Sequence, residues 1–72
     1  MTNFVYQYHV YNEHISLIVS VPIKEDDYAI NFAKRVAKDF YDYTEEQLNN
    51  IQCEFIVMFF TESVINVKKL NQ

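Results

Sequence analysis

IQCEFIVMFFT, at residues 51–61, is the stretch that decides the fold of this chain. The six residues from Phe55 to Phe60 are all apolar, and their β-branched and aromatic side chains favour a strand. Because side chains alternate between the two faces of a strand, a run without polar residues needs cover on both faces. Strict alternation predicts that one set of side chains faces a helix: Cys53, Phe55, Val57 and Phe59. The other set is predicted to face another chain: Ile56, Met58 and Phe60.

An antiparallel hairpin is predicted before this stretch. Residues 4–11, FVYQYHVY, are rich in aromatic and β-branched side chains, and residues 14–21, HISLIVSV, alternate between apolar and polar positions. Asn12 and Glu13 form the turn between them. Pro22 ends the second strand because its ring nitrogen has no hydrogen to donate.

One long helix follows the hairpin. From Ala29 to Tyr43 the apolar residues recur at helical spacing, with alanines along the middle of the stripe that let the helix lie close to a sheet. Acidic residues at 25–27 suit the positive end of its dipole. The sequence Thr44-Glu45-Glu46-Gln47 is a capping box and predicts a short second helix from Glu45.

These elements predict an α+β fold in a single domain over residues 1–72. Residues 64–70, VINVKKL, alternate and add a fourth strand, so the sheet is antiparallel, built from two hairpins in ββαββ order, with the long helix across one face. The predicted core is Ile15, Leu17, Val19, Val21, Ile30, Ala33, Val36, Ala37, Phe40, Phe55, Val57, Ile65 and Val67.

Composition narrows the function classes. With no glycine, turns must rely on Asn and Asp, and a glycine-rich phosphate loop is excluded. The net charge of -4 argues against sequence-independent nucleic-acid binding. No apolar run is long enough for a membrane span, the start of the chain lacks signal-peptide features, and the single Cys53 suits a reducing cytoplasm.

Catalysis and metal binding have weak signals. Cys53 could be a nucleophile with His9 or His14 as its base, or the three could ligate a metal. Their spacing matches no metal motif, and an isolated cysteine is usually buried and inert. We therefore expect no enzyme activity, no cofactor and no metal.

Seven of the ten acidic residues lie between Glu25 and Glu46. The predicted partner-binding residues among them are Asp39, Asp42, Glu45 and Glu46. Carboxylates spaced along a surface can imitate DNA phosphates and occupy a basic channel. Helix capping and solubility explain the residues at 25–27 well. For the residues at 39–46 the two interpretations are closer, although three cations at 34–38 weaken the mimic.

A small domain buries too little surface to be very stable, and no intrachain disulfide is available, which favours a second copy of the chain. The predicted dimer interface consists of Ile18, Ile56, Met58 and Phe60. The function that we predict is a small, acidic, non-enzymatic interaction protein of phage or mobile-element type. It would bind and modulate or inhibit a larger cytoplasmic protein, such as a DNA-handling host protein that it reaches by partial DNA mimicry. The alternative is a single-stranded nucleic-acid-binding module that stacks bases on aromatic strands.

Overall fold

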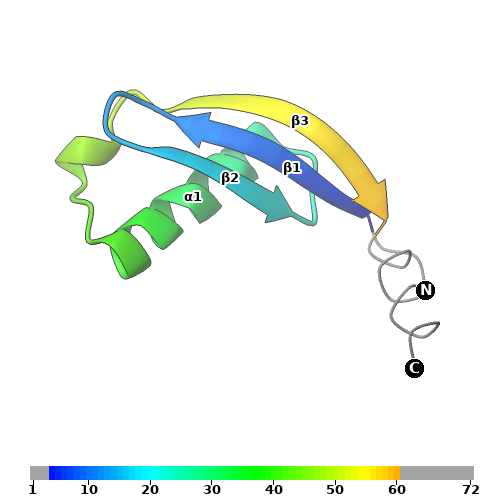
Figure 1. The fold of residues 1–72 in the computed structure, drawn as a ribbon, viewed down its shortest axis with the longest axis horizontal. Helices are drawn as coiled ribbons and strands as arrows, with labels where there is room; N and C mark the ends of the chain where they lie inside the picture. Colours follow the sequence, from blue (N-terminus) through cyan, green and yellow to red (C-terminus); the bar gives the residue numbers. More distant parts are fainter. Residues whose placement is uncertain (1–3, 61–72) are drawn as a thin grey trace.

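The computed structural model of the chain describes residues 4–60 (Figure 1). These residues form a hairpin, a helix, a 3₁₀ turn and a last strand, in that order. The elements are β1 (Phe4–Tyr11), β2 (Ser16–Val21), α1 (Asp26–Tyr41), the 3₁₀ turn η1 (Glu46–Leu48) and β3 (Gln52–Phe60). The predicted hairpin and long helix are confirmed.

The sheet is antiparallel and has three strands in the order β2-β1-β3. The predicted four-stranded sheet from two hairpins in ββαββ order is therefore wrong. β3 pairs with β1, and this pairing places Cys53 beside Val10 and Phe55 beside Tyr8. The predicted strand at 64–70, with Ile65 and Val67, lies outside the described residues.

β1 is the centre of the sheet because both of its edges are paired. Tyr8 lies between Val19 of β2 and Phe55 of β3, and Val10 lies between Leu17 and Cys53. Tyr8 is 1% exposed and Val10 is fully buried. Tyr8 is also the largest of the fully buried side chains, so the predicted core, which contains no residue of β1, is corrected here.

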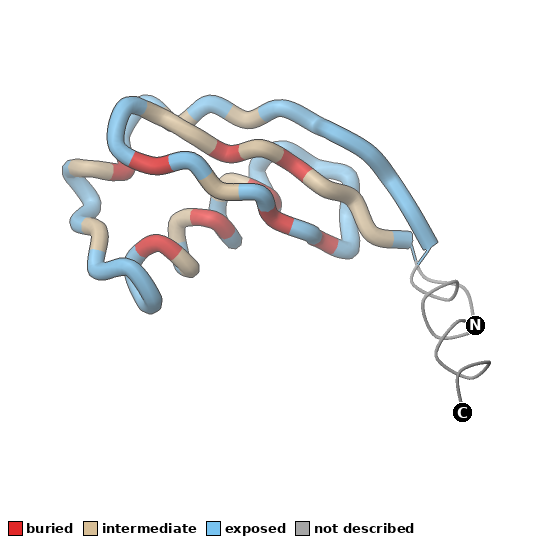
Figure 2. Tube along the Cα trace, in the orientation of Figure 1, coloured by how far each residue is buried: buried red, intermediate tan, exposed pale blue. Residues whose placement is uncertain are grey.

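α1 covers one face of the sheet through its alanines, as predicted. Ala29, Ala33 and Ala37 have no exposed surface, because a methyl side chain lets the helix backbone approach the strands. Figure 2 shows the buried positions gathered on α1, β1 and β2. Phe40, predicted in the core, is instead 77% exposed near the end of the helix.

The rest of the predicted core is confirmed in part around β2 and α1, where Leu17, Ile30 and Val36 are only half-buried, and is wrong in β3. Ile15, Val19 and Val21 are buried beside the helix alanines, whereas Phe55 and Val57 are 42% and 43% exposed. Leu48, which the prediction missed, is buried with Ile15 and Ala37. Leu48 is the last residue of η1, which places its side chain in this cluster. The predicted capping box before η1 is confirmed, because Thr44 and Gln47 form hydrogen bonds in both directions.

Asn and Asp make the turns in this glycine-free chain, as predicted. Asp42 ends α1 in the left-handed conformation with φ 60°, and Asn50 precedes β3 with φ 57°. Both residue types tolerate this conformation better than most. No helix among residues 4–60 is long and apolar enough to cross a membrane.

Candidate protein-interaction surface

β3 contains a β-bulge that changes which side chains share a face. Phe55 pairs with Tyr8 and Val57 pairs with Gln7, so Ile56 is an extra residue without a partner on β1. A bulge places two residues of one strand against one position of the other and shifts the alternation beyond it. The predicted alternation therefore fails from Ile56 onward.

Beyond the bulge, β3 faces the opposite way from the prediction. Met58 pairs with Tyr6 and Phe60 pairs with Phe4, so both lie on the face that carries α1. The Phe4 and Phe60 ring centroids are 4.6 Å apart. Val57 and Phe59 pair with Gln7 and Val5 and lie on the open face of the sheet.

Apolar side chains remain open along this end of the sheet. Each member of the set is between 37% and 47% exposed. We call this set the β3 surface: Phe4, Phe55, Ile56, Val57, Met58, Phe59 and Phe60. In Figure 2 the β3 trace is pale along this stretch, unlike β1 beside it.

Within residues 4–60, the β3 surface is open because β2 and α1 stop short of it. The last residue of β2, Val21, pairs with Tyr6, so Phe4 and Val5 pair only with β3 among the described residues. Figure 1 shows β1 and β3 continuing past the end of β2, away from α1. Lys24 gives partial cover, with its Nζ 4.6 Å from the Phe55 ring centroid, a cation–π distance.

Away from the β3 surface, the open face of the sheet carries several polar pairs and one exposed apolar residue, Ile18. Across its strands Gln7 Nε2 donates to Ser20 Oγ at 3.4 Å, and His9 Nε2 and Ser16 Oγ are 2.7 Å apart. Tyr11 also donates its hydroxyl to Glu54 Oε1 at 2.9 Å. Such polar pairs are typical of a solvent-exposed sheet face. Exposed apolar residues of this sheet are thus concentrated at the end formed by the β3 surface.

The structure divides the four residues of the predicted dimer interface. Met58 and Phe60 lie together on the helix-side face, and Ile56 is the bulge residue between the two faces. Ile18 is 58% exposed but belongs to β2, opposite His9, so β1 separates it from β3. Phe4, which sequence reasoning did not include, joins Phe60 through the strand register, for which the sequence has no local signal.

The predicted partner-binding acids come together around the end of α1. Asp39 and Asp42 lie at the end of the helix, and Glu45 and Glu46 follow in the next turn, all exposed. Lys38 Nζ pairs with Glu45 Oε2. The hydrogen bond and the charge of Lys38 lower the pKa of Glu45. The cluster therefore carries its own counter-ion, which reduces its resemblance to a row of phosphates.

The proposed thiol chemistry has no geometric support. Cys53 lies on the helix-side face opposite Val10, whereas His9 lies on the other face opposite Glu54. Burial, followed by the charge of Asp26, raises the pKa of the Cys53 thiol, so the unreactive protonated form is favoured. Within residues 4–60, no group of three or more His, Cys, Asp or Glu side chains is arranged to hold a metal ion.

The aromatic residues do not form one platform for bases. Tyr8 is buried under α1, while Tyr11 lies on the open face and stacks with His9 at 4.5 Å between ring centroids. Phe59 lies on the open face and Phe60 on the helix side. Base-stacking domains need several exposed rings on one face with cations nearby. The division between faces gives the nucleic-acid alternative little support.

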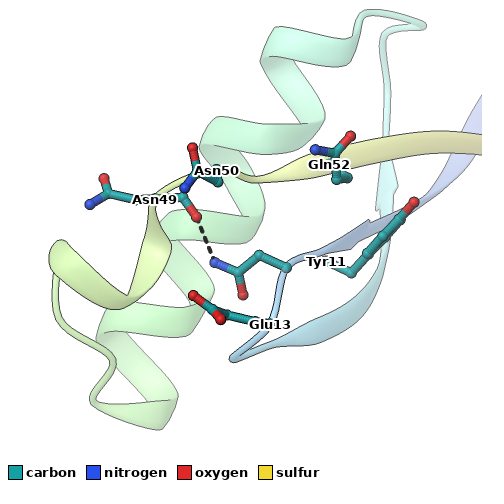
Figure 3. A pocket seen from close by; sticks show the side chains of 6 residues that line it. Tyr11, Glu13, Asn49, Asn50 and Gln52 are labelled. Carbon is teal, nitrogen blue, oxygen red and sulfur yellow. Dashed lines mark hydrogen bonds between the residues drawn. The ribbon is translucent and has the colours of Figure 1, made fainter.

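A pocket of about 460 Å³, lined by residues with polar side chains, lies beside the hairpin turn (Figure 3). It is lined by Tyr11, Asn12, Glu13, Asn49, Asn50 and Gln52. These side chains offer amide and hydroxyl hydrogen bonds with one carboxylate, and general acid–base catalysis commonly uses a matched pair of titratable groups. We assign the pocket no chemistry.

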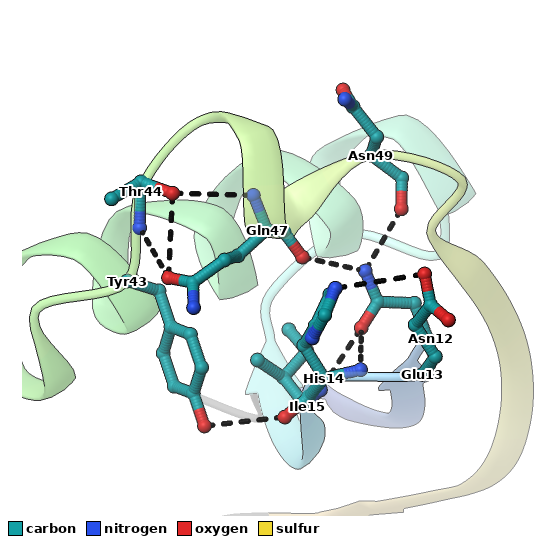
Figure 4. A network of polar contacts seen from close by, with 8 residues as sticks. All are labelled: Asn12, Glu13, His14, Ile15, Tyr43, Thr44, Gln47 and Asn49. Carbon is teal, nitrogen blue, oxygen red and sulfur yellow. Dashed lines mark hydrogen bonds and ion pairs between the residues drawn. The ribbon is translucent and has the colours of Figure 1, made fainter.

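Asn12 joins the segments that meet at this corner (Figure 4). Its Oδ1 accepts hydrogen bonds from the backbone N–H groups of His14 and Ile15, at 2.7 and 2.9 Å. Its Nδ2 donates to the carbonyl oxygens of Gln47 and Asn49, both at 2.8 Å. One side chain therefore builds the hairpin turn and joins it to the segment that leads into β3.

No family model matches the sequence, and neither a curated protein nor a solved structure is significantly similar to it. The functional interpretation therefore rests on the geometry of this chain alone.

Proposed function

We propose that this chain is a non-enzymatic protein-interaction module whose binding surface is the β3 surface. The observation that carries the proposal is the row of six consecutive apolar residues, Phe55 to Phe60, each more than a third exposed on a strand at the sheet edge. Large exposed apolar patches are typical of interaction sites, and protein–protein contacts are among the main kinds.

The composition of the surface suits a protein partner. Phenylalanine and methionine are enriched at the cores of protein interfaces, and charged residues are depleted there. The run from Phe55 to Phe60 has four such residues and no charge. The raised pKa of the Cys53 thiol and its separation from His9 support a non-enzymatic role, and a single cysteine fits a reducing compartment such as the cytoplasm.

A second version of the proposal places the partner on the acidic cluster, as a DNA mimic that binds a DNA-handling protein. The pairing of Lys38 with Glu45 makes this version the weaker one. It predicts that binding to a basic DNA-handling protein is lost when Asp39, Asp42, Glu45 and Glu46 are replaced together by amides. Binding through the β3 surface would survive that replacement.

Site-specific photocrosslinking in cells tests the proposed function. A photoreactive phenylalanine analogue replaces Phe59 in one variant and Ile18 in the control variant, since both residues are apolar and lie on the open face. We expect a covalent adduct to a protein from position 59 and little from position 18. Equal labelling from both positions, or no adduct from either, would contradict the proposal.

A further inference from the structure

The outer edge of β3 lacks most of the devices that keep an exposed strand from pairing. Among the described residues β3 pairs only with β1, so its other edge presents unpaired backbone groups. Natural edge strands are blunted by lysines, prolines or inward-pointing charges. From Phe55 to Phe60 there is no charge, proline or glycine. The bulge at Ile56 is the one irregularity in the described β1–β3 ladder, and residues 57–60 continue the strand after it.

We propose that the outer edge of β3 pairs antiparallel with β3 of a second copy of this chain. The proposal rests on the proposed function and names its partner. It forms a continuous six-stranded sheet in the order β2-β1-β3-β3-β1-β2, with both helices on the same face. The two-fold axis lies at Met58, where Val57 of each copy is opposite Phe59 of the other.

The partner is a second copy because the edge is complementary to itself. An added strand must be extended, uncharged and apolar on both of its sides, and these are the properties of residues 56–60. The pairing of Val57 with Phe59 matches two open-face side chains, as opposite residues in an antiparallel ladder require. A two-fold interface of this kind closes on itself and leaves no further open β3 edge.

Charge selects the antiparallel orientation. Glu54 is the charged residue at the start of the apolar run, and it is held on the open face by Tyr11. Antiparallel pairing puts the two Glu54 carboxylates at opposite ends of the shared ladder. Parallel pairing would place them side by side, and like charges directly opposite destabilise a sheet.

The exposed area that this pairing can cover suits a weak dimer. A large aromatic side chain carries roughly 200 Å², so the five paired residues 56–60, exposed by 37–47%, offer at most about 400 Å² per copy. The total for two copies, at most about 800 Å², lies below the roughly 1,000 Å² expected of a stable specific interface. We therefore expect a dimer that dissociates on dilution through the micromolar range.

Sedimentation of the full chain tests the pairing. We expect a dimer at about 100 µM that dissociates toward about 1 µM. Met58→Lys should weaken it at least about 30-fold because two like charges meet at the axis, and Met58→Glu should do the same. An equimolar mixture of these two variants should recover the dimer as a heterodimer. Ile18→Lys, on the far edge of the sheet, should leave the dimer constant unchanged.

A cysteine scan separates pairing from a general loss of folding. In a Cys53→Ser background, single cysteines at positions 56–60 are oxidised mildly, with Ile18→Cys as the control. Disulfide formation should peak at position 58, where the two chains meet. A wild-type monomer at 100 µM, or no recovery on mixing the two Met58 variants, would overturn the second copy as partner. If the photocrosslink from position 59 then identifies a different protein, the proposed function stands and this inference fails.

Discussion

Phe4 and Phe60 lie with ring centroids 4.6 Å apart on the face of the sheet that carries α1. Phe55 lies on that face too, opposite Tyr8, although five positions separate it from Phe60 and simple alternation would place the two rings on opposite faces. The extra residue, Ile56, shifts the alternation by one position, so both rings lie on the same face. This one residue determines which side chains form each half of the β3 surface.

Deletion of Ile56 should leave the fold intact. Without it Phe55 still pairs with Tyr8 and Val57 with Gln7, so every side chain keeps its face. We expect the free energy of unfolding, measured by urea denaturation, to change by about 1 kcal/mol or less. Deletion of Ile18 is the control, because it turns Leu17 to the open face and should cost about 2–4 kcal/mol. Equal losses from the two deletions would contradict the bulge.

Leu48→Ala should be strongly destabilising. Leu48 is 1% exposed against Ile15 and Ala37, and truncation of a buried leucine leaves a cavity that costs about 2–5 kcal/mol. Phe40→Ala is the matched comparison, since that ring is 77% exposed and its removal should cost less than about 1 kcal/mol. Chemical denaturation of both variants checks the order, and a larger loss at Phe40 would refute the placement of η1 over the core.

Asn12→Asp should destabilise the chain about as much as Asn12→Ala, by roughly 2–4 kcal/mol. An aspartate keeps the acceptor for the N–H groups of His14 and Ile15, but it loses both donors and directs a negative oxygen at two carbonyl oxygens. Thermal unfolding measured by circular dichroism gives the comparison. Asn49→Ala retains the backbone carbonyl that Asn12 uses and should have a small effect, so a loss there as large as at Asn12 would count against the network.

Stability should fall above about pH 10, in part because of Tyr8. Burial, with a smaller contribution from Asp26, raises the pKa of Tyr8 above its usual 10.0. The unfolded chain then loses this proton at a lower pH than the folded chain does, so the contribution is complete below pH 10 and declines as pH rises, by up to about 1.4 kcal/mol per pH unit.

Tyr8→Phe should reduce this alkaline slope while changing stability little at pH 7, where both states hold the proton. Urea denaturation at several values from pH 8 to 11 measures the slope. Tyr28→Phe, which removes an exposed phenol on α1, is the control and should retain the wild-type slope. If Tyr8→Phe also retains it, the buried phenol is not the cause.

The sequence could predict the elements whose signals are local. The apolar spacing and alanines of α1, the alternation of β2, the Thr44–Gln47 capping box and the use of Asp42 and Asn50 in turns all depend on residues a few positions apart. Such signals arise from the geometry of one turn or one strand, so they are visible before the chain folds.

Partner choice between strands was decided by the tertiary structure alone. Nothing near Gln52–Phe60 indicates that this strand pairs with β1, because strand edges present the same backbone groups to any partner. The pairing, in turn, buries Tyr8 and Val10, creates the bulge at Ile56 and joins Phe4 to Phe60. The sequence by itself determined that residues 55–60 are apolar and need cover. Which faces they present, and that they remain open at the end of the sheet, follow from where β2 and α1 stop, which is a property of packing over long range.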